Sequence, residues 1–218
     1  MNFYSLEYSA SNLIGNGDCQ ARCLSNDDIV RSFIRQPFPI VPEILQFELR
    51  FKAELTNCLS QYAIASGGLL IDERFKKILE SYVLMKHKFY SVVLFDQTGV
   101  INGNYFWMQI KESFTDEIDY VNSDFYETNL ATRGPQINFS SFSDYEAQRN
   151  QKGWEWNSKA KEIVIIPNSK LLNMDLFTLW PFDNRICISE KLKNSLQQNK
   201  ITGIEIKKYE KIRFFGQT

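Results

Sequence analysis

The sequence predicts an α+β protein with a mixed or antiparallel sheet, on two observations. Apolar residues alternate with polar ones in several short runs, as they do in strands that bury one face. A strand–helix–strand pattern also occurs twice, at residues 69–94 and 186–206. A shift of 117 positions aligns the two copies without a gap and places Ile71 on Ile188. We therefore expect two related strand–helix–strand units in one core.

In each unit an apolar run ends at a residue that can begin a helix. Asp72 and Ser189 carry side-chain oxygens that can accept hydrogen bonds from the free N–H groups of a first helical turn. Glu73 and Glu190 follow them and add negative charge where the helix dipole favours it. The apolar stripe of the first helix has helical spacing and consists of Phe75, Ile78, Leu79, Tyr82 and Val83.

The chain before the first unit is expected to contain two strands and two short helices. Alternating residues predict strands over 2–8 and 44–51. A helix is expected over 29–34, after the capping residues Asn26-Asp27-Asp28. Three prolines keep 36–42 extended. The short apolar stretch 56–65 favours helix over strand.

After the first unit, three further regions are expected to form strands. Residues 91–95 and 105–110 flank a run of turn residues and predict a hairpin with a long loop. Residues 161–166 form a short apolar run that ends at Pro167, and the basic tail 207–215 also has a strand-like pattern.

Two stretches between these strands have unusual compositions. Residues 112–127 hold six acidic side chains and no basic one. In 131–160, Ile137 is the one aliphatic residue larger than alanine, and aromatic residues stand among polar ones. We expect 131–160 to be a long surface segment, because few aliphatic side chains are present to build a core.

Length and composition are those of an ordinary globular protein. We expect a single domain over residues 1–218, with a strand-rich region at 1–60 and a core at 67–218 that contains both units. Apolar residues make up 44% of the chain and charged residues 23%. The net charge of −1 provides no field that would attract nucleic acid or an anionic membrane, so neither is expected as a partner.

Targeting signals and cysteine usage predict a cytoplasmic protein. The N-terminal residues lack the basic and then apolar pattern of a signal peptide, and no apolar run is long enough to cross a membrane. Four scattered cysteines are too few for a disulfide scaffold and fit a reducing compartment.

Signals for catalysis are poor, so no enzyme activity, metal or cofactor is expected. His87 is the single histidine and lies between two lysines, which excludes a multi-histidine metal site. No nucleophile elbow, phosphate loop or dinucleotide fingerprint occurs. A pair of catalytic carboxylates stays open, since the chain has 26 acidic residues and nothing selects among them.

The features that favour binding lie within residues 112–160. The acidic run is either a solvated loop or a docking patch for a basic partner, in which case Asp116, Glu117 and Asp119 would steer association. Trp154 and Trp156 either cap the core or anchor an interface, because Trp and Tyr dominate binding hot spots. The candidate site therefore comprises Asp116, Glu117, Asp119, Tyr145, Trp154 and Trp156.

Several segments resemble those of a bacterial family of immunity proteins encoded beside polymorphic toxins. They are Phe47-Glu48-Leu49, residues 53–60, residues 67–79 with Gly67-Gly68-Leu69-Leu70-Ile71-Asp72-Glu73-Arg74-Phe75, residues 87–90, residues 186–193 and residues 201–205. The resemblance runs from about residue 40 to 210 and is weak in 111–160. Asp72 stands where the family usually has Ser and Asn57 where it usually has Asp, and both changes keep a polar or capping role.

The resemblance implies an immunity protein for interbacterial competition. Such a protein binds a cognate protein toxin in the bacterial cytoplasm and neutralises it, without catalysis and without a cofactor. The residues alone leave two alternatives open: a small-molecule or peptide-binding domain, and a carboxylate-dependent hydrolase. They identify neither the toxin nor the oligomeric state.

Overall fold

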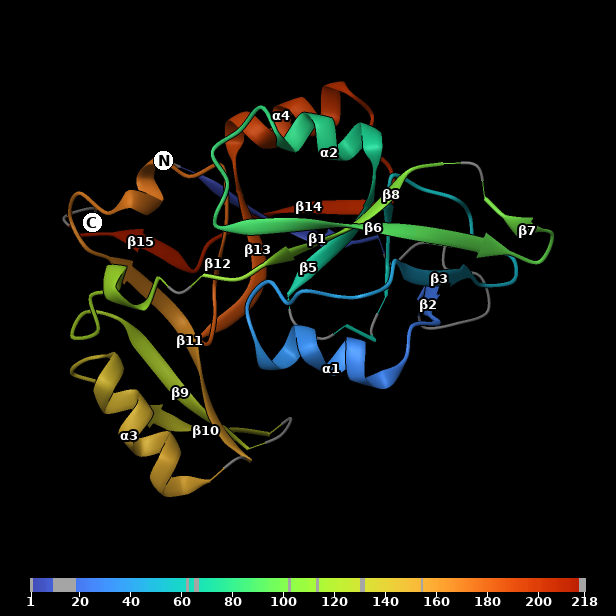
Figure 1. Ribbon diagram of the computed structural model, residues 1–218. Coiled ribbons are helices and arrows are strands. Elements are labelled where there is room, and N and C mark those ends of the chain that lie inside the picture. The colour runs from blue at the N-terminus through green and yellow to red at the C-terminus, as the bar shows by residue number, and fades with distance from the viewer. Residues whose placement is uncertain are drawn as a thin grey trace.

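The structure of the protein is a computed structural model that describes residues 2–9, 19–61, 63–64, 67–101, 103–112, 114–129, 132–153 and 155–215. Within these ranges the chain forms four α-helices and three sheets, as expected for an α+β protein (Figure 1). Pairing is antiparallel except between β3 and β6 and between β11 and β15. No helix in these ranges is both long and apolar enough to cross a membrane.

The largest sheet has seven strands and is covered on both faces. Its strands are β2 (Ala21–Cys23), β3 (Leu45–Leu49), β6 (His87–Asp96), β8 (Tyr105–Ile110), β5 (Gly68–Asp72) and β4 (Cys58–Leu59), with β7 (Gly99–Val100) paired to β6. Helix α1 (Asp27–Arg35) covers one face and α2 (Glu73–Leu79) the other. Alternation along β5 therefore sends Leu70 toward α1, and Leu69 and Ile71 toward α2.

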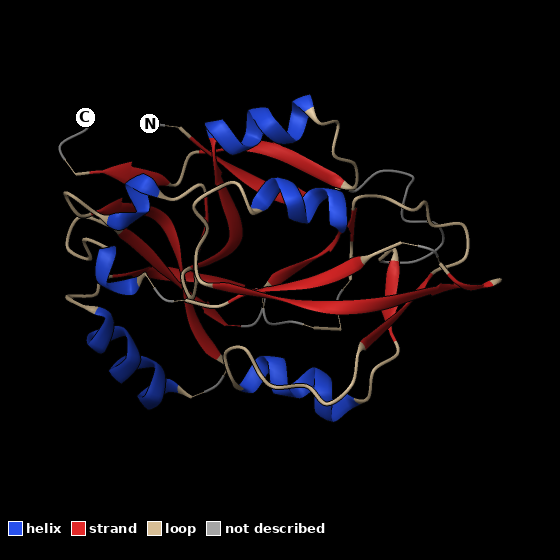
Figure 2. Cartoon of the chain, turned by 45° about the horizontal axis from the view of Figure 1, so that its top comes forward, coloured by secondary structure: helices blue, strands red, loops and turns tan. Residues whose placement is uncertain are grey.

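The second sheet has four antiparallel strands, in the order β12 (Leu176–Leu179), β13 (Asp183–Ser189), β1 (Phe3–Tyr8) and β14 (Ile204–Tyr209). Helix α4 (Glu190–Gln198) follows β13 and lies beside α2 in both views (Figures 1 and 2). The side chains of Leu192 and Leu196 from α4 join Phe75 and Leu79 from α2 in one hydrophobic cluster.

Both predicted units have the expected element order, β5–α2–β6 and β13–α4–β14. In each unit a further strand, β8 or β1, pairs antiparallel with both strands and separates them. The expected caps are present: Asp72 accepts a hydrogen bond from the Phe75 N–H at 2.8 Å, and Ser189 accepts one from the Leu192 N–H at 3.1 Å. That the two units superpose as a repeat stays a prediction.

The expected helix over 56–65 is wrong, because the described residues of this stretch form no helix and contain β4 (Cys58–Leu59). Tertiary contacts override the local preference. The Cys58 N–H donates to the Thr202 carbonyl at 3.1 Å. Gly203, at φ 82°, lies so close that an added Cβ would be 1.9 Å from the Cys58 oxygen. The exit of α4 therefore holds this segment against the seven-stranded sheet.

The expectation of a surface segment over 131–160 is also wrong. These residues contribute β10 (Thr132–Ile137), α3 (Phe142–Lys152) and the start of β11 (Trp156–Ile165). The third sheet has the order β10, β9 (Asp124–Asn129), β11 and β15 (Ile212–Phe214), and α3 packs against it (Figure 1). We call β9, β10, α3 and residues 156–160 of β11 the aromatic lobe.

Aromatic rings supply the core that aliphatic residues do not. The rings in mutual contact are those of Tyr120, Phe125, Phe139, Phe142, Tyr145, Trp156 and Phe182. Each ring buries a large area, so a handful of them can hold a helix on a sheet.

The remaining expected strands and the helix over 29–34 are confirmed. The strands expected over 2–8, 44–51 and 161–166 are β1, β3 and the second half of β11. The expected hairpin is formed by β6 and β8, and the expected helix over 29–34 is α1, which starts two residues earlier.

Two other expectations are wrong in part. Helix α2 ends at Leu79, so Tyr82 and Val83 of the expected stripe lie beyond it, and Val83 is exposed. Residues 36–42 are not extended throughout, because Phe38 has a φ of 51°.

Candidate functional site

The three predicted steering carboxylates lie on and just after the 3-10 helix η2 (Thr115–Glu117). Glu117 forms an ion pair with Lys170 at 3.9 Å, and its side chain is 16% exposed. Asp119 accepts hydrogen bonds from the backbone and side-chain N–H groups of Asn122, at 3.2 and 2.8 Å. The Asp116 carboxylate is exposed and has no ion-pair partner among the described residues. Asp116 is therefore the carboxylate of the three that is free to meet a partner.

The rest of the acidic run is neutralised by lysines from later in the chain. Glu112 lies 3.8 Å from the Lys170 ammonium, and Asp124 lies 3.9 Å from that of Lys161. Glu127 pairs with Lys152, whose ammonium holds the pKa of this carboxyl below its ordinary value. The six acidic residues consequently do not act together as a negative patch.

The predicted aromatic anchors lie in the core of the aromatic lobe. Tyr145 is 1% exposed, and its hydroxyl donates to the Asn157 side chain at 3.0 Å. Trp156 is 7% exposed and lies 6.1 Å from the Tyr145 ring, with the Lys152 ammonium over its face. Of the two interpretations of Trp156, this position corresponds to a core-capping residue. Trp154 lies outside the described residues.

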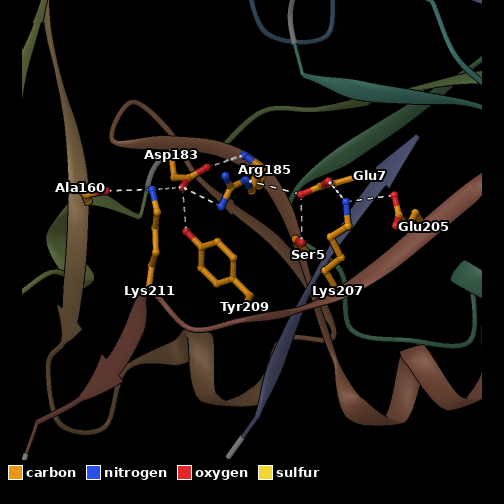
Figure 3. A network of polar contacts seen from close by, with 9 residues as sticks. All are labelled: Ser5, Glu7, Ala160, Asp183, Arg185, Glu205, Lys207, Tyr209 and Lys211. Atoms are coloured by element: carbon orange, nitrogen blue, oxygen red, sulfur yellow. Dashed lines mark hydrogen bonds and ion pairs between the residues drawn. The ribbon is translucent and has the colours of Figure 1, made fainter. Parts of the chain in front are cut away.

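A charged network that the sequence did not reveal joins the second sheet to the aromatic lobe (Figure 3). Its centre is Asp183, which is 7% exposed. The Asp183 carboxylate accepts hydrogen bonds from the Tyr209 hydroxyl at 3.0 Å and the Lys211 ammonium at 3.1 Å. Lys211 also donates to the Ala160 carbonyl of β11 at 2.9 Å. On the outer side, Arg185 lies 3.6 Å from Glu7.

The electrostatics of this network favour a structural role. Burial opposes ionisation of Asp183 most strongly, but the bonds from the Arg185 N–H, Lys211 and Tyr209 together hold its pKa below the ordinary value. Burial, with the nearby Cys187 and Asp183, raises the pKa of Tyr209. A general base works best with a pKa near the operating pH, whereas this carboxylate is held ionised and hydrogen-bonded. Its local sequence, Asp183-Asn184-Arg185, looks like an ordinary turn, so only the fold reveals it.

A hollow of about 910 Å³, lined by both polar and apolar side chains, lies between α2, α4 and residues 103–105. Its charged wall includes Asp72, Glu73, Arg74 and Lys77. Asp72 caps α2, and Glu73 pairs with Lys77 at 3.0 Å, so both carboxylates already have partners.

In the described ranges, the single histidine and the side chains of metal-binding type are not arranged as a metal site. His87 is the first residue of β6, half-buried, with its Nδ1 2.8 Å from the Met85 carbonyl oxygen. No group of three or more His, Cys, Asp or Glu side chains in these ranges is arranged to hold a metal ion.

Comparison with known proteins identifies the family. The sequence model of the immunity protein family (Imm11) matches residues 3–211, which is nearly the whole chain. The matched range includes all three sheets up to the loop before β15 and all four helices. No curated protein matches the sequence. On the extent of the family match, the chain belongs to the immunity protein family (Imm11).

Proposed function

We propose that this protein binds a cognate protein toxin and neutralises it by direct contact. The observation that carries the proposal is the family match over residues 3–211. The toxin would belong to a polymorphic toxin system used in interbacterial competition, and this protein would bind it in the bacterial cytoplasm. Neither nucleic acid nor a membrane belongs to the proposal.

Neutralisation by contact, and not by a reaction, is supported by the state of the titratable groups. The most deeply buried carboxylate with charged partners, Asp183, is held ionised within an internal network. The carboxylates that line the hollow beside α2 are engaged in a helix cap and an ion pair. Such groups stabilise a fold, while catalysis needs groups that can exchange a proton near neutral pH.

We place one contact with the toxin at the aromatic lobe and the adjoining η2. Asp116 is exposed and would steer a basic region of the toxin, while Glu117 and Asp119 hold the turn that presents it. Tyr145 and Trp156 would not touch the toxin but would support the contact by fixing α3 on its sheet. Trp154 stays in the proposal as a candidate anchor on the strength of its residue type alone.

We also propose that residues 1–218 form one domain, in which the strand-rich region at 1–60 joins the core at 67–218 and the units at 69–94 and 186–206 are related by repetition. One hydrophobic cluster supports this, because it contains Phe3 of β1, Leu79 of α2, Phe125 of β9 and Ile188 of β13. A core shared by all three sheets is typical of a single cooperative unit.

The test of the function is co-purification with the C-terminal toxin domain encoded by the neighbouring gene. A stable complex and survival of cells that produce both proteins are expected. A neighbouring metabolic operon, with no toxin and no complex, would instead favour a small-molecule or peptide binder.

The Asp116 contact is tested by association kinetics. Asp116→Asn should slow association with the toxin about two- to tenfold and weaken its salt dependence, because a rim charge acts mainly on the encounter. Glu54→Gln is the matched control, since Glu54 is an exposed carboxylate that forms no ion pair with a described residue. Equal association rates for both variants would remove Asp116 from the interface.

A further inference from the structure

The segment between α1 and β3 exposes an unusual amount of apolar surface. Ile40 is 92% exposed, and Ile34, at the end of α1, is 48% exposed. Phe38 is half-buried between them. Single exposed apolar residues are common, whereas several on one short segment are typical of an interaction surface.

This segment is held in place from beneath. Gln109 of β8 is fully buried, and its amide donates to the Phe33 carbonyl at 3.0 Å and accepts from the Phe38 N–H at 2.9 Å. The Tyr90 hydroxyl donates to the Pro39 carbonyl at 2.9 Å. Prolines at 37, 39 and 42 restrict the remaining freedom. A partner would therefore bind a preformed shape and lose little entropy in ordering it.

The backbone of Phe38 indicates that the shape is maintained against a local preference. Its φ of 51° lies in the left-handed region, which bulky side chains rarely adopt. The buried Gln109 compensates by binding the Phe38 N–H. Strained residues of this kind cluster at functional surfaces.

Four basic side chains lie near this segment. The Lys86 ammonium lies 5.7 Å from the centre of the Phe38 ring, and that of Lys88 lies 4.8 Å from the Tyr90 ring. Lys111 donates to the Ile34 carbonyl at 3.2 Å, and Arg35 is in the last turn of α1.

None of these four forms an ion pair with a described carboxylate, whereas Lys152, Lys161 and Lys170 each pair with a carboxylate of the acidic run. Glu43 is the one acidic residue of 34–46 and stands near the β3 end of the segment. The group formed by Ile34, Phe38 and Ile40 with these four cations is called the Ile40 face below.

We infer that the Ile40 face is a docking surface for a protein segment that carries acidic residues around an apolar centre. The inference rests on the proposed function, and the segment accordingly belongs to the toxin. The cations select acidic groups, and the isoleucines supply desolvated contact area. Nucleic acid would satisfy the cations but would leave the aliphatic side chains without a counterpart.

The position of the Ile40 face agrees with a two-sided contact. In Figure 1 the C-terminal end of α1 is the end of that helix nearer to β10 and β11. A toxin held there can also reach the aromatic lobe. Because the Ile40 face is basic and Asp116 is acidic, the two regions together would fix the orientation of the bound toxin.

The experiment measures binding of the neighbouring toxin domain to purified full-length variants. Ile40→Asp should weaken binding at least about tenfold, mainly through faster dissociation. Lys86→Glu with Lys88→Glu should slow association at least about tenfold and reduce its salt dependence. The controls are Val100→Asp, at a 62% exposed apolar residue of β7, and Lys191→Glu with Lys208→Glu, on α4 and β14. The controls should bind within about twofold of the wild type.

The outcomes separate the inference from the proposed function. Wild-type affinity for Ile40→Asp and for the Lys86 and Lys88 double variant overturns the inference and leaves toxin binding intact. Failure of the wild type to bind the toxin overturns the proposed function and the inference with it. A third outcome also overturns the inference: the protein binds a duplex oligonucleotide, the Lys86 and Lys88 double variant does not, and Ile40→Asp binds it as the wild type does. An unchanged unfolding midpoint for each variant shows that folding is not the cause.

Discussion

The two strand–helix–strand units and the aromatic lobe reach buried cores by different means. In the units, aliphatic residues recur at helical or strand spacing, and Leu79, Leu192 and Leu196 are buried as that spacing indicates. In the aromatic lobe the core residues are fewer, larger and irregularly spaced. Periodicity therefore predicts the units, whereas it makes the lobe look like a surface segment.

The difference shows that a few buried aromatic side chains and the capping residues of a helix can specify a packed lobe. Helix α3 presents Tyr145 as its buried residue, among polar neighbours. Its ends are nonetheless readable in the sequence: Ser141 accepts from the Asp144 N–H at 3.2 Å, and Gly153 follows the helix at φ 88°. Attention to such caps would find a helix that hydrophobic spacing does not reveal.

Among these predictions, the largest loss of stability is expected for truncation of Tyr145, in the core of the aromatic lobe. Tyr145→Ala should lower the free energy of unfolding by about 3–5 kcal/mol, because it removes a fully buried ring that contacts Phe139, Trp156 and Phe182. Tyr145→Phe, which removes only the hydrogen bond to Asn157, should cost about 0.5–1.5 kcal/mol. Chemical denaturation measures both. A loss under about 0.5 kcal/mol for Tyr145→Ala would mean that the rings do not hold the lobe.

The matching truncation in the first unit is Leu79→Ala. Leu79 is fully buried, so the variant should lose about 2–5 kcal/mol. Val83→Ala is the control, because Val83 is 53% exposed and should change stability by no more than about 0.5 kcal/mol. Both truncations should shift one common transition. Separate transitions for the lobe and the units would break the single-domain proposal.

The Asp183 network gives a smaller, pH-dependent effect. Because the folded-state pKa of Asp183 lies below that of the unfolded chain, the ionised carboxylate stabilises the fold above about pH 4. This contribution is lost as the pH falls through the folded-state pKa. Asp183→Asn should cost about 1.5–3 kcal/mol at pH 7 and less at pH 2. Parallel stability curves for wild type and variant between pH 7 and pH 2 would contradict this account of the network.

The smallest effect is expected at His87. Its ring makes one hydrogen bond, to the Met85 carbonyl, and an edge contact with Phe89. His87→Ala should therefore cost less than about 1.5 kcal/mol and leave protection against the toxin intact. A folded His87→Ala protein that fails to protect cells would overturn the expectation that no catalytic histidine is involved.

Whether the sequence predicts a structural feature depends on whether that feature is made by residues close together in the chain. The caps at Asp72 and Ser189 and most strands follow from neighbouring residues and are predicted. The extended segment expected from the prolines at 37, 39 and 42 is not extended throughout, because the contact of the Phe38 N–H with Gln109 is not local. The acidic run looks unpaired in the sequence because Lys152, Lys161 and Lys170, which neutralise it, lie 25 or more residues beyond their partners and approach them only through the fold. The Ile40 face escapes prediction for the same reason. Its cations come from α1 (Arg35), from around the start of β6 (Lys86 and Lys88) and from the residue after β8 (Lys111), which are far apart in the sequence.

The central claim, neutralisation by binding, is tested most directly by titrating the neighbouring toxin domain with this protein while following the toxin's activity. The account predicts that inhibition reaches its end point at a stoichiometric amount of this protein. It also predicts that toxin separated from the complex has an unchanged mass and regains its activity. Inhibition by far less than a stoichiometric amount, with a toxin of altered mass, would contradict the account, as would full toxin activity in the presence of excess protein.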